Sequence, residues 1–316
     1  KGIGECAIFR GLSYDDVPDY EEKLTWLCKN INLDFEVLKK ELLHYPSIIF
    51  GLEQALLNLE HGEDLYFPSD FTDGKDSIKI NGLIWMGNAD FMQSQIEEKL
   101  AKGFDCIKLK IGVDWKSEKE IIKKLREKFP KEQLELRVDA NGAFSYEEAR
   151  MVLQELADLG IHSIEQPIKK SEVRSPKSEE NSEKKSTDCC VPWNEMAKLC
   201  AETPTPIALD EELIGVIDFE EKKKLLETIK PQYIILKPAL VGGFSGSDEW
   251  IAIAESLGIN WWITSALESN IGLNAICQYT YTKKNPLPQG LGTGALFTNN
   301  FETHLQLEGD QMWHKK

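Results

Sequence analysis

Three acidic residues each stand at the end of a short apolar run. They are Asp139 in RVDANG, Glu165 in SIEQP and Asp210 in ALDEE. Carboxylates brought close together repel one another and raise one another's pKa unless a hard divalent cation binds them. Because no His or Cys stands with them at the ends of these runs, the oxygen-only set favours Mg²⁺, with Mn²⁺ as a substitute, over zinc or copper. We predict that the three acids are metal ligands; for any one of them alone, capping of a turn or helix is the competing interpretation.

Two lysines interrupt an otherwise apolar run, FDCIKLKIG at 104–112. Lys108 and Lys110 are two residues apart, so in a strand their side chains share one face. A solvated face of an edge strand would explain them, but a third lysine, Lys237, follows the strand after Asp210. Near a cation and another ammonium the pKa of a lysine falls, so that a neutral amine removes a proton α to a carboxylate. We therefore expect one site that binds a small-molecule carboxylate substrate.

Strand-like runs recur at nearly equal spacing, and helix-like periodicity fills the intervals, as at 117–129, 145–160 and 247–258. The runs lie at 78–85, 106–111, 134–140, 161–167, 206–212, 233–239, 260–266 and 287–293. Eight strands alternating with helices predict a (β/α)8 barrel, whereas a doubly wound sheet usually has fewer strands. In a barrel the carboxyl ends of the strands surround one mouth, which brings the acids and lysines together.

One interval of the repeat is longer than the others. It contains residues 169–188, a segment rich in Ser, Lys and Glu with almost no apolar residues. Such a segment cannot bury enough surface to order itself, so we interpret it as a disordered surface insertion. The rest of 78–293 is predicted to be the barrel. Residues 1–77 lack the repeat and read as a separate α+β unit that 294–316 completes.

Composition narrows the classes of partner. The chain has 316 residues and a net charge of −16, which argues against a nucleic-acid-binding surface. No apolar stretch is long enough to span a membrane. The seven cysteines form no CxxC or other zinc-ligand spacing, and they favour a reducing, cytoplasmic compartment. The chain starts without methionine, so we expect residues upstream of Lys1; the oligomeric state stays open.

Motifs along nearly the whole chain outside 169–190 resemble those of the enolase superfamily, in the branch with a KxK pair. They are IKLKIG, RVDANGAF, IEQP, ALDEEL, LKPALVGG, SALES and GLGTG. The opening GIGECAIFRGLSYDD and the LDEEL and GLGTG forms are most similar to the o-succinylbenzoate synthase family. The resemblance implies an α/β fold, an enolase-like modified (β/α)8 barrel of the (β/α)7β type with an α+β capping domain. It also implies that the N-terminal part of the cap is missing from the chain as given.

The resemblance also implies roles for individual residues. Asp139, Glu165 and Asp210 would bind Mg²⁺, and Lys110 would act as base and then acid in the syn dehydration of 2-succinyl-6-hydroxy-2,4-cyclohexadiene-1-carboxylate, a step of menaquinone biosynthesis. Lys237 would stabilise the enediolate, and Lys108 would tune Lys110. The expected substrate contacts are Thr264, Ser265, Gly290, Gly292, Asn141 and Arg137. From its position two residues before Asp139, Arg137 equally suits pairing with a neighbouring acid.

Two other functions remain open at this stage. An N-acylamino acid racemase or dipeptide epimerase uses the same paired lysines for two-base proton transfer. Dipeptide epimerases tend to carry an acidic DxD element near the last strand, where this chain has GLGTG, and this favours the dehydratase. The second alternative is a non-catalytic barrel that binds a metal or a metabolite.

Overall fold

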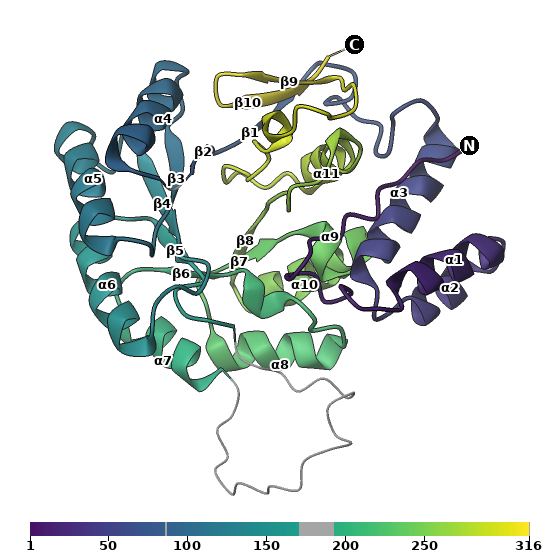
Figure 1. Cartoon of the computed structure of the whole chain (residues 1–316), viewed down its shortest axis with the longest axis horizontal. Coiled ribbons are helices and arrows are strands. Elements are labelled where there is room, and N and C mark those ends of the chain that lie inside the picture. The colour runs from purple at the N-terminus through teal and green to yellow at the C-terminus, as the bar shows by residue number, and fades with distance from the viewer. Residues whose placement is uncertain (86, 171–192, 316) are drawn as a thin grey trace, which may run out of the picture.

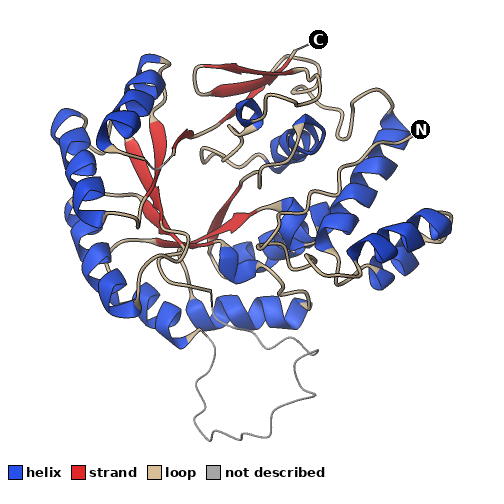
Figure 2. Cartoon of the chain, in the orientation of Figure 1, coloured by secondary structure: helices blue, strands red, loops and turns tan. Residues whose placement is uncertain are grey.

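The computed structural model describes residues 1–85, 87–170 and 193–315. Parallel strands curl into a barrel wall, and helices cover its outer side (Figures 1 and 2). From residue 171 on, the insertion predicted at 169–188 lies outside the described residues. No helix in the described ranges is long and apolar enough to cross a membrane.

Seven strands form the wall, and each pairs in parallel with the next strand along the chain. They are β2 (Gly82–Ile84), β3 (Cys106–Lys110), β4 (Glu135–Asp139), β5 (Ser163–Glu165), β6 (Ile207–Leu209), β7 (Tyr233–Leu236) and β8 (Asn260–Ile263). The register aligns Lys110 with Asp139 and Asp139 with Glu165, so the ends of β3, β4 and β5 lie level. Predicted site residues on neighbouring strands are thereby brought to one rim.

The outer face of the wall carries the apolar core. Ile107 and Leu109 are fully buried in one cluster with Ile122 and Leu125 of the helix that follows β3. Lys108, between them in sequence, points the other way and is only 6% exposed. The solvated edge strand is therefore excluded, because the second face of β3 is the barrel interior.

The barrel closes through a short bridge instead of the full eighth strand predicted at 287–293. Only Gln289 and Gly290 bridge to neighbouring backbone, at Ile80 and Thr264. The backbone carbonyl of Gln289 accepts a hydrogen bond from the backbone N–H of Asn81 at 2.9 Å. The prolines at 286 and 288 have no N–H to donate, which prevents a longer ladder. Seven β/α units and this bridge make the predicted (β/α)7β barrel, which is confirmed.

Helices follow each strand of the wall. They are α4 (Ala89–Ala101), α5 (Trp115–Lys128), α6 (Tyr146–Asp158), α7 (Asn194–Glu202), α8 (Phe219–Ile229), α9 (Pro238–Val241), α10 (Gly243–Ser256) and α11 (Asn270–Lys283), with short 3₁₀ turns η2 (Glu211–Leu213) and η3 (Gly294–Leu296). The barrel helices predicted at 117–129, 145–160 and 247–258 correspond to α5, α6 and α10. The last of these begins earlier than predicted, at Gly243.

The first unit contains α1 (Tyr20–Asn30), α2 (Phe35–Glu41) and α3 (Pro46–His61). Residues 1–9 look strand-like in sequence but form no strand; they run along α3. Ile3 N donates to Asn58 Oδ1 at 3.0 Å, which satisfies backbone that has no strand partner. A Cβ at Gly4 would lie 2.0 Å from the Gly51 carbonyl oxygen, so glycine permits this close approach.

The predicted strand 78–85 splits between two sheets. Its first part lies in β1 (Ser77–Lys79), which pairs antiparallel with β10 (Gln311–His314). β10 in turn pairs with β9 (Leu305–Glu308). Its second part is β2 of the barrel. We propose that 294–316 completes the unit formed by 1–77; the pairing of β10 with β1 and the burial of His314 against Phe71 support this division.

Candidate active site

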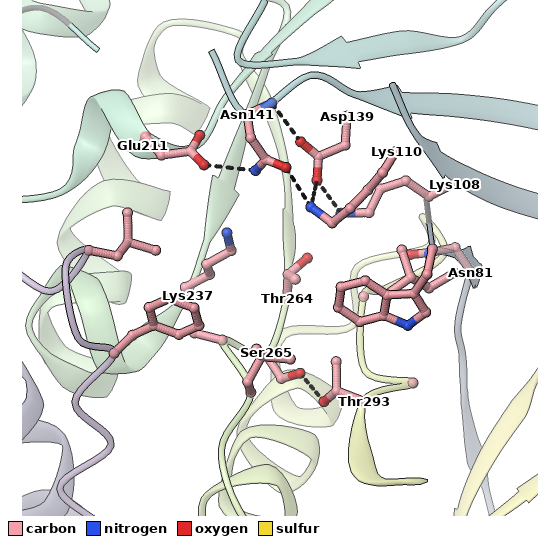
Figure 3. A pocket seen from close by; sticks show the side chains of 18 of the residues that line it. Asn81, Lys108, Lys110, Asp139, Asn141, Glu211, Lys237, Thr264, Ser265 and Thr293 are labelled. Atoms are coloured by element: carbon pink, nitrogen blue, oxygen red, sulfur yellow. Dashed lines mark hydrogen bonds and ion pairs between the residues drawn. The ribbon is translucent and has the colours of Figure 1, made fainter. Parts of the chain in front are cut away.

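A cavity of about 410 Å³ opens at the carboxyl ends of the strands. Nine predicted site residues line it: Lys108, Lys110, Asp139, Asn141, Lys237, Thr264, Ser265, Gly290 and Gly292. Figure 3 shows most of them converging from different strands. Three predicted residues, Glu165, Asp210 and Arg137, are not among its lining residues.

The lysines of β3 bind different partners. Lys108 Nζ donates to Glu165 Oε2 at 2.9 Å and to Asp139 Oδ2 at 3.4 Å. Lys110 Nζ donates to Asp139 Oδ2 at 3.0 Å and to Asn141 Oδ1 at 2.6 Å (Figure 3). The first lysine thus reaches back to the acids, whereas the second lies toward the cavity.

Lys237 enters the same cavity from the end of β7, immediately before α9. Its ammonium forms an ion pair with Asp210, which follows β6. Lys110 and Lys237 therefore come from the ends of two separate strands of the wall and line one space (Figure 3). The cavity is therefore lined by an amine from each of these two strand ends.

The acids and lysines shift one another's protonation. Burial favours neutral Asp139, but the ammoniums of Lys108, Lys110 and Lys237 outweigh it and hold the pKa of Asp139 below its usual value. Burial raises the pKa of Glu165 to about 7, opposed by Lys108 and reinforced by the other two acids.

The pKa values of Lys108 and Lys237 are raised. Burial would lower both, but the carboxylates around them dominate. The sequence-based expectation of a lowered lysine pKa assumes a bound cation beside the amines. Where the carboxylates are the nearest charges, they raise the pKa values of both lysines instead.

The acids suit a hard cation chemically, although they do not form a ready-made cage. Within the described ranges, no three His, Cys, Asp or Glu side chains are arranged to hold a metal ion. The ammoniums of Lys108 and Lys237 instead neutralise the acids. Glu165 Oε1 is buried without a hydrogen-bond partner in the described structure, which leaves a free oxygen of the kind that Mg²⁺ prefers. The donor set therefore fits the metal predicted from sequence.

Arg137 lies away from the cavity. Its fully buried side chain donates through Nε to Glu135 at 2.7 Å and through Nη1 to the Pro288 carbonyl at 2.9 Å. The guanidinium also lies over the Trp262 ring, 4.3 Å from its centroid. Arg137 shares the inward face of β4 with Asp139 but lies two residues farther from the mouth. It forms an ion pair with Glu135, which is the alternative that the sequence analysis left open.

The predicted substrate contacts from the last strands form one wall of the cavity. Ser265 Oγ hydrogen-bonds Thr293 Oγ1, and Thr264 Oγ1 is buried without a partner among the described residues. A Cβ on Gly290 would lie 2.3 Å from Thr264 Oγ1, so only glycine fits there. This wall presents hydroxyls and backbone in place of charges.

Sequence reasoning did not select several residues that line the cavity. The segment Phe9–Leu12, belonging to the first unit, lies far from the barrel in sequence, and nothing in its composition indicates a site. Glu211 had a signal, because it directly follows Asp210 in LDEEL. Trp85, at the end of the first strand-like run, contacts Lys110, whose Nζ is 5.9 Å from its ring centroid.

Comparisons with known proteins agree with this architecture. A family model described as enolase C-terminal domain-like matches residues 92–178 and 188–311. The solved structure of MenC from Desulfotalea psychrophila LSv54 is 40% identical, with a TM-score of 0.81 over 99% of this chain and 90% of that chain. A substrate-liganded L-Ala-D/L-Glu epimerase from Bacillus subtilis superposes with a TM-score of 0.77 over 99% of this chain and 84% of that one; at 21% identity it shows the fold alone.

Proteins of similar sequence show to which family within this fold the chain belongs. The chain is 33% identical to the N-succinylamino acid racemase of Thermus thermophilus over 56% of its own length and 40% of that protein. It is 49% identical to the o-succinylbenzoate synthase of Desulfotalea psychrophila over 98% of this chain and 87% of that protein. The chain therefore belongs to the enolase superfamily and, within it, to the o-succinylbenzoate synthase family.

Proposed function

We propose that the chain is a carbon–oxygen hydro-lyase that converts 2-succinyl-6-hydroxy-2,4-cyclohexadiene-1-carboxylate to 2-succinylbenzoate and water, in menaquinone biosynthesis. One observation carries the proposal: the chain matches an o-succinylbenzoate synthase at 49% identity over 98% of its length. The three lysines around one cavity supply groups suited to this reaction. A non-catalytic barrel is no longer needed as an explanation.

We assign Asp139, Glu165 and Asp210 as ligands of Mg²⁺, with Mn²⁺ as a substitute. They end neighbouring strands β4 and β5 or follow β6, and they supply only oxygen. When bound, the cation stabilises the negative charge that develops as the proton α to the carboxylate leaves.

We assign the proton transfers to Lys110. As a neutral amine it takes the ring proton α to the carboxylate; as an ammonium it returns that proton to the departing hydroxyl on the same face, which leaves as water. One group serves both steps because the elimination is syn. Lys237, from β7, stabilises the enediolate by its charge, and Lys108 maintains the local field through Glu165 and Asp139.

The remaining assignments concern substrate binding. We propose that Thr264, Ser265, Gly290 and Gly292 line the path of the succinyl side chain, since they form the uncharged wall of the cavity. Asn141 contacts Lys110 and stays in the site as a polar lining residue. Arg137 is left out as a direct contact because it does not line the cavity and its Nε and Nη1 donate to Glu135 and Pro288. A cytoplasmic location is part of the proposal, as it suits a metabolic enzyme.

The test is turnover of the cyclohexadiene substrate by purified protein with Mg²⁺. We expect loss of the ultraviolet absorbance of the diene, formation of 2-succinylbenzoate, and neither in a Lys110→Ala variant. Absence of turnover, together with efficient racemisation of N-succinylamino acids, would contradict the proposal.

N-acylamino acid racemisation is a second candidate. It needs two bases in one cavity, and Lys110 and Lys237 both line the space. Incubating single enantiomers of N-succinylamino acids in D₂O tests it: interconversion of the enantiomers that is lost in both Lys110→Ala and Lys237→Ala, while each variant still exchanges the α-proton of one enantiomer, would support racemisation. Dipeptides assayed in the same way test the epimerase alternative.

A further inference from the structure

Asn141 connects the end of β4 to groups from two other strands. Its backbone is left-handed, with φ of +44°, and its N–H donates to Asp139 Oδ1 at 3.1 Å. Its side-chain Oδ1 accepts from Lys110 Nζ at 2.6 Å, and Nδ2 donates to Glu211 Oε1 at 2.9 Å (Figure 3). One amide therefore links Lys110 of β3 to Glu211 after β6.

The chemistry of the two partners fixes the direction of that amide. An ammonium only donates hydrogen bonds, and an ionised carboxylate only accepts them. A flipped Asn141 would direct its NH₂ group at the Lys110 ammonium and its oxygen at the Glu211 carboxylate. Glu211 therefore holds the amide in the one orientation that offers an acceptor to Lys110.

Stability does not explain Glu211. Its side chain lies at the rim of the cavity in the short turn η2, where Oε1 accepts from Asn141 Nδ2. Its second oxygen, Oε2, is buried and has no hydrogen-bond partner in the part of the chain that the structure describes. A carboxylate oxygen that is buried without a partner costs stability, so the contact of Glu211 with Asn141 is better explained by what that contact positions.

We propose that Glu211 is a positioning residue that acts through Asn141 to hold the Lys110 amine. With the amide fixed, Asn141 Oδ1 and Asp139 Oδ2 hold Lys110 Nζ from two sides at the edge of the cavity. The inference rests on the base role proposed for Lys110 and adds a residue from the turn after β6 that positions this base.

We call the series of contacts from Glu211 through Asn141 to Lys110 the relay. Kinetics on four variants test it: Glu211→Leu, Glu211→Gln, Asn141→Ala and the double variant that combines Glu211→Leu with Asn141→Ala. For Glu211→Leu we expect kcat to fall about 100-fold, as for a displaced catalytic group, while KM and the Mg²⁺ Kd change less than about threefold. Glu211→Gln keeps an acceptor for Asn141 Nδ2 and should retain most of kcat. Because the two residues act in series, the double variant should be no slower than Asn141→Ala alone. Additive losses, or a Gln variant as slow as the Leu variant, would overturn the proposal.

A spectroscopic readout separates this inference from the proposed reaction. In metal-free protein labelled with ¹⁵N-lysine, the Nζ signal of Lys110 is identified by its loss in Lys110→Arg. We expect that signal to shift or exchange faster with water in Glu211→Leu and to return in Glu211→Gln. Glu195→Leu, an exposed site in α7, is the matched control and should leave it unchanged. If the Lys110 signal is unchanged in Glu211→Leu, the relay is overturned, whatever substrate the enzyme takes. If the signal shifts but the wild-type protein does not dehydrate the cyclohexadiene, only the proposed function is overturned.

Discussion

Lys108 and Lys110 donate to the same oxygen, Oδ2 of Asp139, at 3.4 and 3.0 Å. Their side chains differ in access, with 8% exposed for Lys108 and 17% for Lys110. Lys108 is also bound to Glu165, whereas the second contact of Lys110 is the Asn141 amide. The pair on β3 is thus divided into a buried charge that organises the acids and an amine at the cavity.

This division predicts the effect of removing the amine at the cavity. Lys110→Ala should lower kcat by at least about 1,000-fold, since the proton acceptor and donor is lost, and should still bind Mg²⁺. Steady-state kinetics and calorimetric metal titration measure the two effects. Lys116→Ala, an exposed lysine in α5, is the control. Near-normal activity in Lys110→Ala would rule out its assignment as base.

The acids predict a dependence on the metal. Treatment with EDTA should abolish turnover, and added Mg²⁺ or Mn²⁺ should restore it. Asp210→Asn should weaken Mg²⁺ binding by at least about tenfold, because a charged oxygen ligand is lost. Calorimetry on the stripped protein measures the affinity; activity that survives complete chelation would contradict the metal assignment.

Glu5 connects the first unit to the barrel through hydrogen bonds to α11, and its removal should weaken that connection. Its carboxylate accepts from the backbone N–H groups of Ser269 at 2.9 Å and Gly272 at 2.8 Å, at the start of α11. Phe9–Leu12, which line the cavity, follow Glu5 closely in the chain. Glu5→Ala should lower the free energy of unfolding by about 1–2 kcal/mol, as for a lost helix cap, and raise KM.

Urea unfolding and steady-state kinetics check both effects of Glu5→Ala. Glu127→Ala, an exposed residue of α5, serves as the control and should change neither quantity. A stability loss without any change in KM would show that Glu5 does not help to place the cavity-lining segment.

The buried carboxyl group of Glu268 should make the free energy of unfolding depend on pH. Burial raises the pKa of this carboxyl to about 7 from 4.5; hydrogen bonds from backbone N–H groups, including that of Ala266, and the charge of Lys237 oppose the rise, and Glu5 reinforces it. Because the folded-state pKa lies above the unfolded value, its contribution to stability is fully present below pH 4.5 and is lost as the pH rises through 7. Glu268→Gln removes this loss. Relative to wild type, the variant should therefore gain about 2–3 kcal/mol between pH 4.5 and pH 8. Urea unfolding at both pH values measures it, and parallel curves would refute the assignment.

The strand pattern could be predicted because it is local. Alternation along CIKLK placed both lysines on one face, and strand–helix repetition brought Asp139 to the same rim. Helix starts depend on which residue caps them: the helix predicted from residue 145 begins with Ser145 as its N-cap, whereas the helix predicted from residue 117 begins earlier, after Asp114. Asp and Ser cap equally well, so local sequence did not separate them.

The last strand could not be predicted in detail. Residues 287–293 are apolar and glycine-rich like a strand, but the prolines before Gln289 restrict pairing to two residues. The break in 78–85 is also tertiary, because β1 pairs with β10 from the C-terminal end of the chain, whereas β2 pairs with β3, the next strand.

The sequence by itself determined which residue types reach the mouth of the barrel, because side-chain alternation and the strand repeat are set by short-range geometry. It therefore identified Lys108, Lys110 and Asp139 together. Only the tertiary structure decided which ammonium neutralises which acid, that Arg137 pairs away from the cavity, and that Glu211 reaches Asn141. Except for the ion pair of Arg137 with Glu135 on the same strand, these contacts join segments that are far apart in the chain, and they depend on distances that no local pattern encodes.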